Sequence, residues 1–184
     1  MLAAYMSAAR DSSRLSSPAL FAGILIVTLA TLLVGLLSRR MADRGASAPA
    51  SVDFRLATLD GRRLGPADFD GRVVLVDFWA TWCGPCHIQR QILEPLYRDF
   101  KGRGVEFLAV SLGEDLETVE RFVRRNPYPY PVLVDPEDEL SVELEIYALP
   151  TLMVIDRRGQ VAFFEPGLAD GEKLRRILQQ ALAA

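Results

Sequence analysis

The chain has 184 residues, of which 50% are hydrophobic and 24% are charged, and its formal net charge is −3. These values fit one globular domain with an additional segment. No basic stretch is long enough for a nucleic-acid footprint, so we expect no nucleic-acid partner. Both cysteines and the only histidine lie within five consecutive residues, too few ligands for structural zinc and too few cysteines for a disulfide framework.

Residues 19–37 form an apolar stretch in which Thr28 and Thr31 are the only polar side chains. At about 1.5 Å per residue, a helix of this length covers the hydrocarbon core of a bilayer. We therefore expect a short N-terminal segment over 1–18 and a single transmembrane anchor over 19–37. The alternative is a cleaved signal peptide, because residues 48–50 (Ala-Pro-Ala) resemble a cleavage site.

The charges that flank this stretch do not settle its orientation. Arg10 and Arg14 precede it, and arginines follow it at positions 39, 40 and 44. The positive-inside rule thus favours, slightly, a cytoplasmic location for the rest of the chain. Residues 38–51 are small, polar and contain Pro and Gly, which predicts a flexible linker to a globular domain over 52–184.

The first half of this domain begins with a hairpin pattern. Asp60-Gly61, between two short alternating runs, predicts a β-hairpin within 54–71. A nearly continuous apolar run then predicts a buried central strand over 72–80. Helical spacing over 85–101 predicts a helix, whose expected buried stripe consists of Ile88, Ile92, Leu96 and Phe100.

The second half continues the alternation of strands and helices. The expected elements are a strand over 104–112, a helix over 114–125, a connecting loop over 126–131, a strand over 130–135 and a short helix over 138–147. A second hairpin is expected from residues 150–156 and 160–166, and a closing helix over 170–184 with Asp170 as its N-cap. This alternation indicates an α/β fold whose sheet is covered on both faces.

The sequence Cys83-Gly84-Pro85-Cys86-His87 fits two chemistries, a thioredoxin-like redox site and a covalent haem-attachment site. Cys83 lies where a strand passes into a helix, and the helix N-terminus stabilises a thiolate there. Gly84 and Pro85 suit the first helical turn, and Cys86 is close enough to form a disulfide with Cys83. This context favours thiol chemistry, with a haem-binding electron-transfer protein as the alternative.

Two stretches carry a resemblance to a known family. VVLVDFWATWCGPCHIQRQILEPLYRDF (73–100) and YALPTLMVIDRRGQVAFFEPG (147–167) resemble the thioredoxin superfamily. More narrowly, they are similar to the TlpA/ResA/CcmG group of membrane-anchored thiol–disulfide oxidoreductases. The resemblance implies a thioredoxin fold, in which helices flank a central mixed sheet, with an N-terminal β-hairpin and a central αβ insertion at about 114–147.

The resemblance also implies the site residues. Cys83 would be the nucleophile and Cys86 the resolving cysteine, with the redox disulfide formed between them. Pro150 matches the family's cis-proline. The residues expected to shape the site and to meet the substrate are Trp82, Gly84, Pro85, Leu149, Pro150 and Thr151.

The chain departs from the group's pattern at two positions. Gln89 stands where the group usually has Glu, and Asp77 stands where it often has Asn. Since burial raises the pKa of a carboxyl group, our hypothesis is that Asp77 is the general base for Cys86; a solvent-facing aspartate is the alternative. His87, four residues after Cys83, could stabilise the Cys83 thiolate, or could simply be exposed.

The function implied is a thioredoxin-like enzyme, without cofactor or metal, that reduces protein disulfides outside the cytoplasm. The implied partners are protein disulfide substrates, such as apocytochrome c or metal-site proteins, a membrane thiol electron donor and, through 19–37, the lipid bilayer. The resemblance places the domain on the periplasmic face of a bacterial inner membrane, against the weak charge signal. A general disulfide oxidase or isomerase is the functional alternative.

Overall fold

The computed structural model describes residues 23, 26–35 and 51–184 of the chain. Residues 26–35 are helical and exposed. Within the described ranges, no helix combines the length and the apolar character needed to cross a membrane. The expected N-terminal segment, both ends of the expected anchor and all of the expected linker except Ser51 lie outside the described residues, which leaves those boundaries as expectations.

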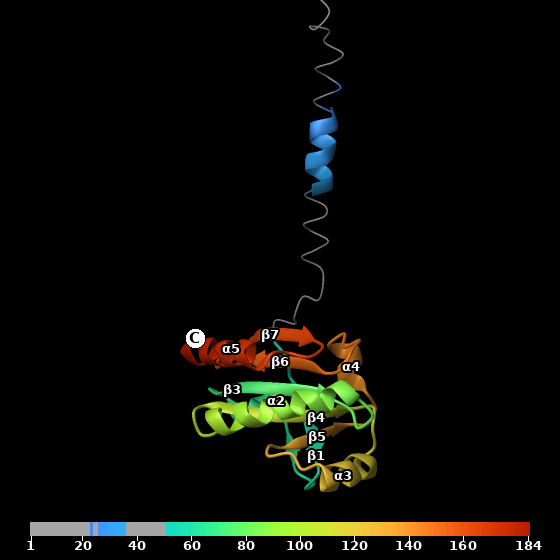
Figure 1. The fold of residues 1–184 in the computed structure, drawn as a ribbon, viewed down its shortest axis with the longest axis vertical. Helices are drawn as coiled ribbons and strands as arrows, with labels where there is room; N and C mark the ends of the chain where they lie inside the picture. The colour runs from blue at the N-terminus through green and yellow to red at the C-terminus, as the bar shows by residue number, and fades with distance from the viewer. Residues whose placement is uncertain (1–22, 24–25, 36–50) are drawn as a thin grey trace, which may run out of the picture. The chain divides into compact units, whose positions relative to one another are not determined.

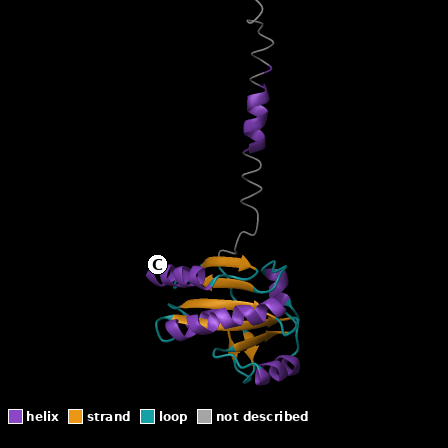
Figure 2. Ribbon diagram, viewed as in Figure 1, coloured by secondary structure: helices purple, strands orange, loops and turns teal. Residues whose placement is uncertain are grey.

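Residues 51–184 form a seven-stranded mixed sheet with helices on both faces (Figures 1 and 2). The strands are β1 (Leu56–Thr58), β2 (Arg63–Leu64), β3 (Val73–Trp79), β4 (Val105–Leu112), β5 (Val132–Asp135), β6 (Thr151–Ile155) and β7 (Val161–Pro166). The helices are η1 (Pro66–Phe69), α2 (Gly84–Phe100), α3 (Leu116–Arg125), α4 (Glu139–Glu143) and α5 (Gly171–Ala183). The strand order is β2-β1-β5-β4-β3-β6-β7, and β3, β4 and β5 run parallel to each other.

Strand β3 is the centre of the sheet, and all seven of its residues are buried. A strand that is covered on both faces consists almost entirely of apolar residues, and this is why the sequence predicted β3 close to its actual bounds. Its side chains alternate between two cores. Val73, Leu75 and Trp79 enter one core, whereas Val74, Val76 and Phe78 enter the other.

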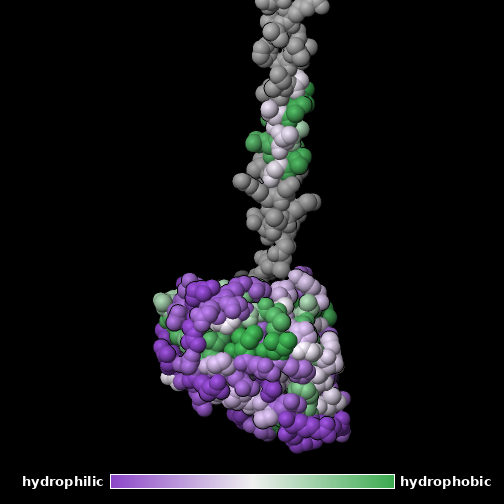
Figure 3. All heavy atoms as spheres, viewed as in Figure 1, coloured by the Kyte–Doolittle hydropathy of each residue, from purple (hydrophilic) through white to green (hydrophobic). Residues whose placement is uncertain are grey.

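The first core lies under α2, α3 and α5. Helix α2 was expected at nearly these bounds. Leu96 and Phe100 of its expected buried stripe are buried, but Ile88 is 51% exposed, so the stripe is wrong at that position. The side chains that α2 buries are Cys86, Gln89, Leu93, Leu96 and Phe100. The phase of the helix follows from Cys86, which must face inward to reach Cys83, and this turns Ile88 outward. Figure 3 shows hydrophobic surface between α2 and α5 on the visible face.

The second core lies under α4 and η1. Leu140 of α4 and the following Leu144 pack there with Phe54 and Phe78. Helix α4 is shorter than the helix expected over 138–147, because Glu145 takes a left-handed backbone conformation (φ 52°) that cannot continue a helix.

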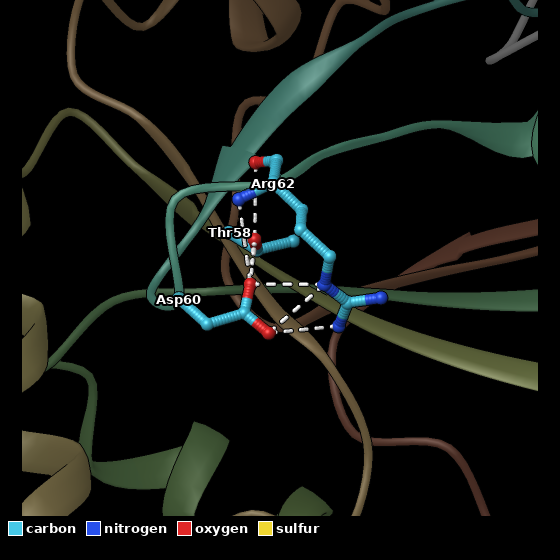
Figure 4. Close-up of polar contacts among 3 residues, drawn as sticks. All are labelled: Thr58, Asp60 and Arg62. Atoms are coloured by element: carbon cyan, nitrogen blue, oxygen red, sulfur yellow. Dashed lines mark hydrogen bonds and ion pairs between the residues drawn. The ribbon is translucent and has the colours of Figure 1, made fainter.

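The N-terminal hairpin, β1 and β2, extends the sheet by pairing with β5. Its turn requires Gly61, whose φ is +82°. Asp60 holds the turn together (Figure 4): it accepts hydrogen bonds from the Thr58 hydroxyl and from Arg62 Nε, the latter at 2.9 Å. The Thr58 hydrogen bond is the main cause that holds the pKa of Asp60 below its usual value.

Candidate active site

The two cysteines lie where β3 passes into α2. Cys83 is the N-cap of α2, and its sulfur accepts a hydrogen bond from the Cys86 N–H at 3.2 Å. The two sulfurs form a disulfide, with 5.3 Å between the Cα atoms. An N–H donor and the positive end of the helix dipole at the Cys83 sulfur both stabilise the thiolate that reduction would produce.

The disulfide lies just below the surface. Cys83 is 3% exposed and Cys86 is 1% exposed. The residues around them are open to solvent: Trp82 is 73% exposed, and Gly84 and Pro85 are exposed as well. A partner that reacts with the disulfide therefore has to approach across this part of the surface.

The segment Leu149–Pro150–Thr151 lies at the same end of the sheet. The Leu149–Pro150 peptide bond is cis, and Pro150 is buried. Thr151 begins β6 opposite Phe78, close to the point where β3 leads into the cysteine motif. The Thr151 hydroxyl donates to the Ala148 carbonyl at 2.7 Å, which holds the bend before Pro150 in place.

Asp77 is fully buried in the middle of the sheet, so the expected alternative of a solvent-facing side chain does not occur. Its neighbours on the adjacent strands are Ala109 and Leu152, which are apolar and also fully buried. Neither carboxyl oxygen has a hydrogen-bond partner among the described residues. Burial raises the pKa of Asp77 from 3.8 to about 8.

Two tyrosines of the loop over 126–131 belong to this buried region, although the sequence indicated only a connector. The ring of Tyr128 lies 5.0 Å from that of Trp79 and 5.7 Å from that of Tyr130. Burial raises the pKa of both tyrosines, and the charge of Asp77 raises it further. The sequence predicted an extended, Pro-rich loop here, but no local pattern indicated that its tyrosines would pack into the core.

Glu114 is a second residue that the sequence did not single out. Its carboxylate accepts hydrogen bonds from the Thr81 N–H at 2.7 Å, from the Thr81 hydroxyl and from the Ser111 hydroxyl at 2.8 Å. Glu114 follows β4, which runs parallel to β3, so the ends of the two strands meet at one edge. It thus fixes the loop that leads into Cys83.

Gln89 and His87 occupy different places on α2. Gln89 is fully buried and hydrogen-bonded to the backbone of Ala169, two residues before α5. His87 is partly exposed, and its ring stacks on that of Phe122 in α3, with 5.2 Å between the centroids. A tuning role of His87 toward Cys83 stays a prediction.

Comparison with known proteins decides between the interpretations of the cysteine motif. Residues 45–164 match the model of the AhpC/TSA family. The chain belongs to this family. It is 33% identical over 158 residues to the thiol-disulfide oxidoreductase ResA of Geobacillus kaustophilus, which covers 85% of this chain and 91% of the relative.

Further similarities agree with this assignment. The chain is 33% identical to the ResA of Halalkalibacterium halodurans, over 70% of this chain and 72% of the relative. A thiol:disulfide interchange protein of the thioredoxin family from Chlorobium tepidum has the same fold, with a TM-score of 0.64 and 27% identity. That similarity covers 74% of this chain and 98% of the other. This family member is a thiol–disulfide oxidoreductase with a thioredoxin-like fold, which favours exchange chemistry over haem attachment at the motif.

Proposed function

We propose that this oxidoreductase reduces disulfides of protein substrates outside the cytoplasm, by exchange at Cys83 and Cys86. The observation that carries the proposal is the position of the disulfide. It lies at a helix N-terminus, directly after the exposed Trp82 in the chain, and in the core on the side of the sheet to which the buried Asp77 points. The helix dipole and the Cys86 N–H would stabilise a Cys83 thiolate there, and a partner protein could approach it from the solvent-exposed residues around it.

The exchange proceeds in two steps. The Cys83 thiolate attacks a disulfide of the substrate, so that a mixed disulfide forms and one substrate thiolate leaves. Cys86 then attacks the Cys83 sulfur, which restores the Cys83–Cys86 disulfide and releases the second substrate thiolate. Two electrons pass from the domain to the substrate, and a thiol donor has to supply two electrons for the next cycle.

Asp77 acts as the general base in the second step. Cys86 is 1% exposed and cannot lose its proton directly to bulk water. Asp77 alternates along β3 with Leu75 and Trp79, so its side chain lies on the side of the sheet whose core contains Cys86. A carboxyl group whose pKa is about 8 stands near the pKa of a thiol, so proton transfer between the two is nearly balanced. The proton goes from the Cys86 sulfur to a carboxyl oxygen of Asp77.

The membrane location is part of the same proposal. Residues 19–37 anchor the chain in a bacterial inner membrane, and residues 38–51 link the anchor to the domain on the periplasmic face. The support is the length and apolar character of residues 19–37 together with the family assignment. The donor is then a membrane thiol protein, and the substrates are proteins whose cysteines must stay reduced, such as apocytochrome c or metal-site proteins.

The reduction potential of the full chain tests the direction of exchange. We expect the Cys83–Cys86 pair, equilibrated against a dithiothreitol or glutathione buffer, to show a potential near the −270 mV of thioredoxin. A value near −120 mV, as in DsbA, would identify an oxidant and overturn the proposal.

Trapping tests the assignment of the two cysteines. We expect Cys86→Ser to accumulate a mixed disulfide with insulin, because nothing resolves it, and Cys83→Ser to form none. If the two variants behave in the opposite way, the roles of Cys83 and Cys86 are reversed.

A further inference from the structure

A buried side-chain contact joins α2 to a segment eighty residues further along the chain. Gln89 Oε1 accepts a hydrogen bond from the Ala169 N–H at 2.8 Å, and Gln89 Nε2 donates to the Ala169 carbonyl at 3.4 Å. Gln89 is fully buried, and Ala169 is 1% exposed. Water therefore does not compete with either hydrogen bond, and the contact fixes one backbone unit to one point on α2.

The fixed unit is connected to Pro150. Gly167, two residues before Ala169, donates its N–H to the Pro150 carbonyl at 2.6 Å. On the helix, Gln89 lies three residues after Cys86, on the same buried face. A continuous series of contacts thus runs from the helix that carries the cysteines, through residues 167–169, to the segment that begins β6.

The contact needs a side chain with both a donor and an acceptor. The planar amide of Gln89 carries both, which is what the N–H and C=O of Ala169 require. An apolar side chain would leave both backbone groups unsatisfied. A carboxylate would still accept from the N–H, but its second oxygen would face the carbonyl oxygen; a protonated carboxyl group would satisfy both.

We propose that Gln89 is a positioning residue that holds the Pro150 segment in place beside the Cys83–Cys86 pair. It sets how well a protein substrate binds across that segment, and leaves the intrinsic reactivity of the cysteines unchanged. The inference rests on the proposed function, since it takes residues 147–149, which are exposed or partly exposed and lead into the buried Pro150, as the surface on which a protein substrate lies.

The test compares Gln89→Leu and Gln89→Glu with a matched control, Gln91→Glu, which is an exposed position on the same helix. KM and kcat are measured for insulin, a protein disulfide, and the second-order rate constant is measured for dithionitrobenzoate, a small disulfide that does not extend over Pro150. We expect Gln89→Leu to raise KM for insulin about tenfold, and to change the rate with dithionitrobenzoate less than twofold.

Gln89→Glu separates positioning from damage to the fold, because one variant is compared with itself. At pH 5 its buried carboxyl group is protonated and replaces the amide, so we expect a KM within twofold of the wild type. At pH 8.5 ionisation breaks the contact, and KM should rise as in Gln89→Leu. The other ionisable side chains on the packed elements include His87, Arg90 and Glu94 of α2, Asp77 of β3, and Asp170, Glu172 and Lys173 at the N-terminal end of α5. The wild type shares all of them, so its own pH profile is the reference for the variant.

Hydrogen exchange gives a readout that does not depend on substrate. The amides of Gly167 and Ala169 should exchange at least tenfold faster in Gln89→Leu, while those of β3 should keep their protection. Unchanged exchange at residues 167–169, or an equal loss of rate with both disulfides, would overturn the inference. If the wild type fails to reduce insulin, the proposed function fails, and the exchange data still decide the contact.

Discussion

The two faces of the central sheet are built from different side chains. The active-site face, covered by α2, α3 and α5, contains the cysteines, Asp77 and the loop tyrosines. The apolar face, covered by α4 and η1, consists of side chains such as Val76, Phe78, Leu108, Val110 and Leu133.

The faces also differ in how their buried polar groups are satisfied. Among the described residues, the buried side-chain atoms that lack a hydrogen-bond partner belong to Asp77, Trp79, Arg90, Tyr128 and Tyr130, all on the active-site face. By contrast, the buried carboxylate of Asp135, beside α4, accepts the N–H of Leu140 at 2.9 Å. Each unsatisfied buried polar group lowers the free energy of unfolding by about 1–3 kcal/mol. The polar groups on the active-site face therefore make the folded protein less stable than an apolar face would.

The largest expected effect concerns Asp77 and pH. Its pKa is about 8 in the folded protein and 3.8 otherwise, so above pH 4 the folded state binds the extra proton. The free energy of unfolding should therefore fall as the pH rises from 4 to 8, by about 1.4 kcal/mol per unit. Asp77→Asn should remove this slope and be the more stable protein at pH 8, as measured by urea unfolding at several pH values. A wild type whose stability is level across this range would contradict the buried, unpaired state of Asp77.

The same variant sharpens the proposed chemistry. If Asp77 is the base for Cys86, Asp77→Asn should be more stable and also slower, by about 10²-fold in insulin reduction at pH 7. If Asp77→Asn shows the same turnover and the same pH profile as the wild type, Asp77 is not the general base, and its burial only lowers stability.

Phe78→Ala tests the apolar face, where packing is the only contribution. Phe78 is fully buried there, so its truncation should lower the free energy of unfolding by about 3–5 kcal/mol. Activity per folded molecule should stay within twofold of the wild type, because the side chain points away from the cysteines. If the reduction potential of the Cys83–Cys86 pair shifts together with the free energy of unfolding, the two faces of the sheet are coupled.

Glu114→Ala tests the edge of the sheet at which the ends of β3 and β4 meet. It removes three hydrogen bonds and leaves the Thr81 N–H without its partner, so we expect a loss of about 2 kcal/mol in the free energy of unfolding. The loop before Cys83 should also loosen, which faster exchange of the Thr81 amide would report. Glu114→Gln, which keeps part of the contacts, should lie between the wild type and Glu114→Ala.

The smallest effect is expected from Tyr130→Phe. The hydroxyl is buried and has no hydrogen-bond partner among the described residues, so its removal breaks no bond that the structure contains. The free energy of unfolding should change by less than about 1 kcal/mol, in either direction. A loss above about 2 kcal/mol would show that the hydroxyl does have a partner, and would weaken the contrast between the two faces.

The sequence predicted those elements whose signal lies within a few neighbouring residues, and it missed features that depend on a distant contact or on a single backbone angle. The apolar run of β3 and the Asp60-Gly61 turn act over a few residues, and both elements form where they were expected. The burial of Leu96 and Phe100 in α2 was predicted, but the exposure of Ile88 was not, because it depends on Cys86 facing inward toward Cys83. The end of α4 was missed because a single left-handed residue, Glu145, decides it.

The candidate site also contains features with a local sequence signal and features without one. The cysteine motif is contiguous and could be located from the sequence alone. The surroundings of Asp77 could not, since Ala109 and Leu152 come from other strands and Tyr130 from a distant loop. The contact from Gln89 to Ala169 spans eighty residues, and no local pattern indicates which glutamine will be buried.

The hairpin at the N-terminal edge has a consequence for association with other chains. A free sheet edge is a row of unpaired backbone groups on which another extended chain can add as a strand. Here the last strand, β2, has only two residues. A Cβ atom added at Gly65 would lie 1.7 Å from the Phe54 carbonyl oxygen, so the position directly after β2 requires glycine. The next residue, Pro66, has no backbone N–H that could pair with another strand. At this edge, the protein thus presents its polypeptide substrates with a strand too short to template aggregation, whereas the opposite edge is the six-residue strand β7.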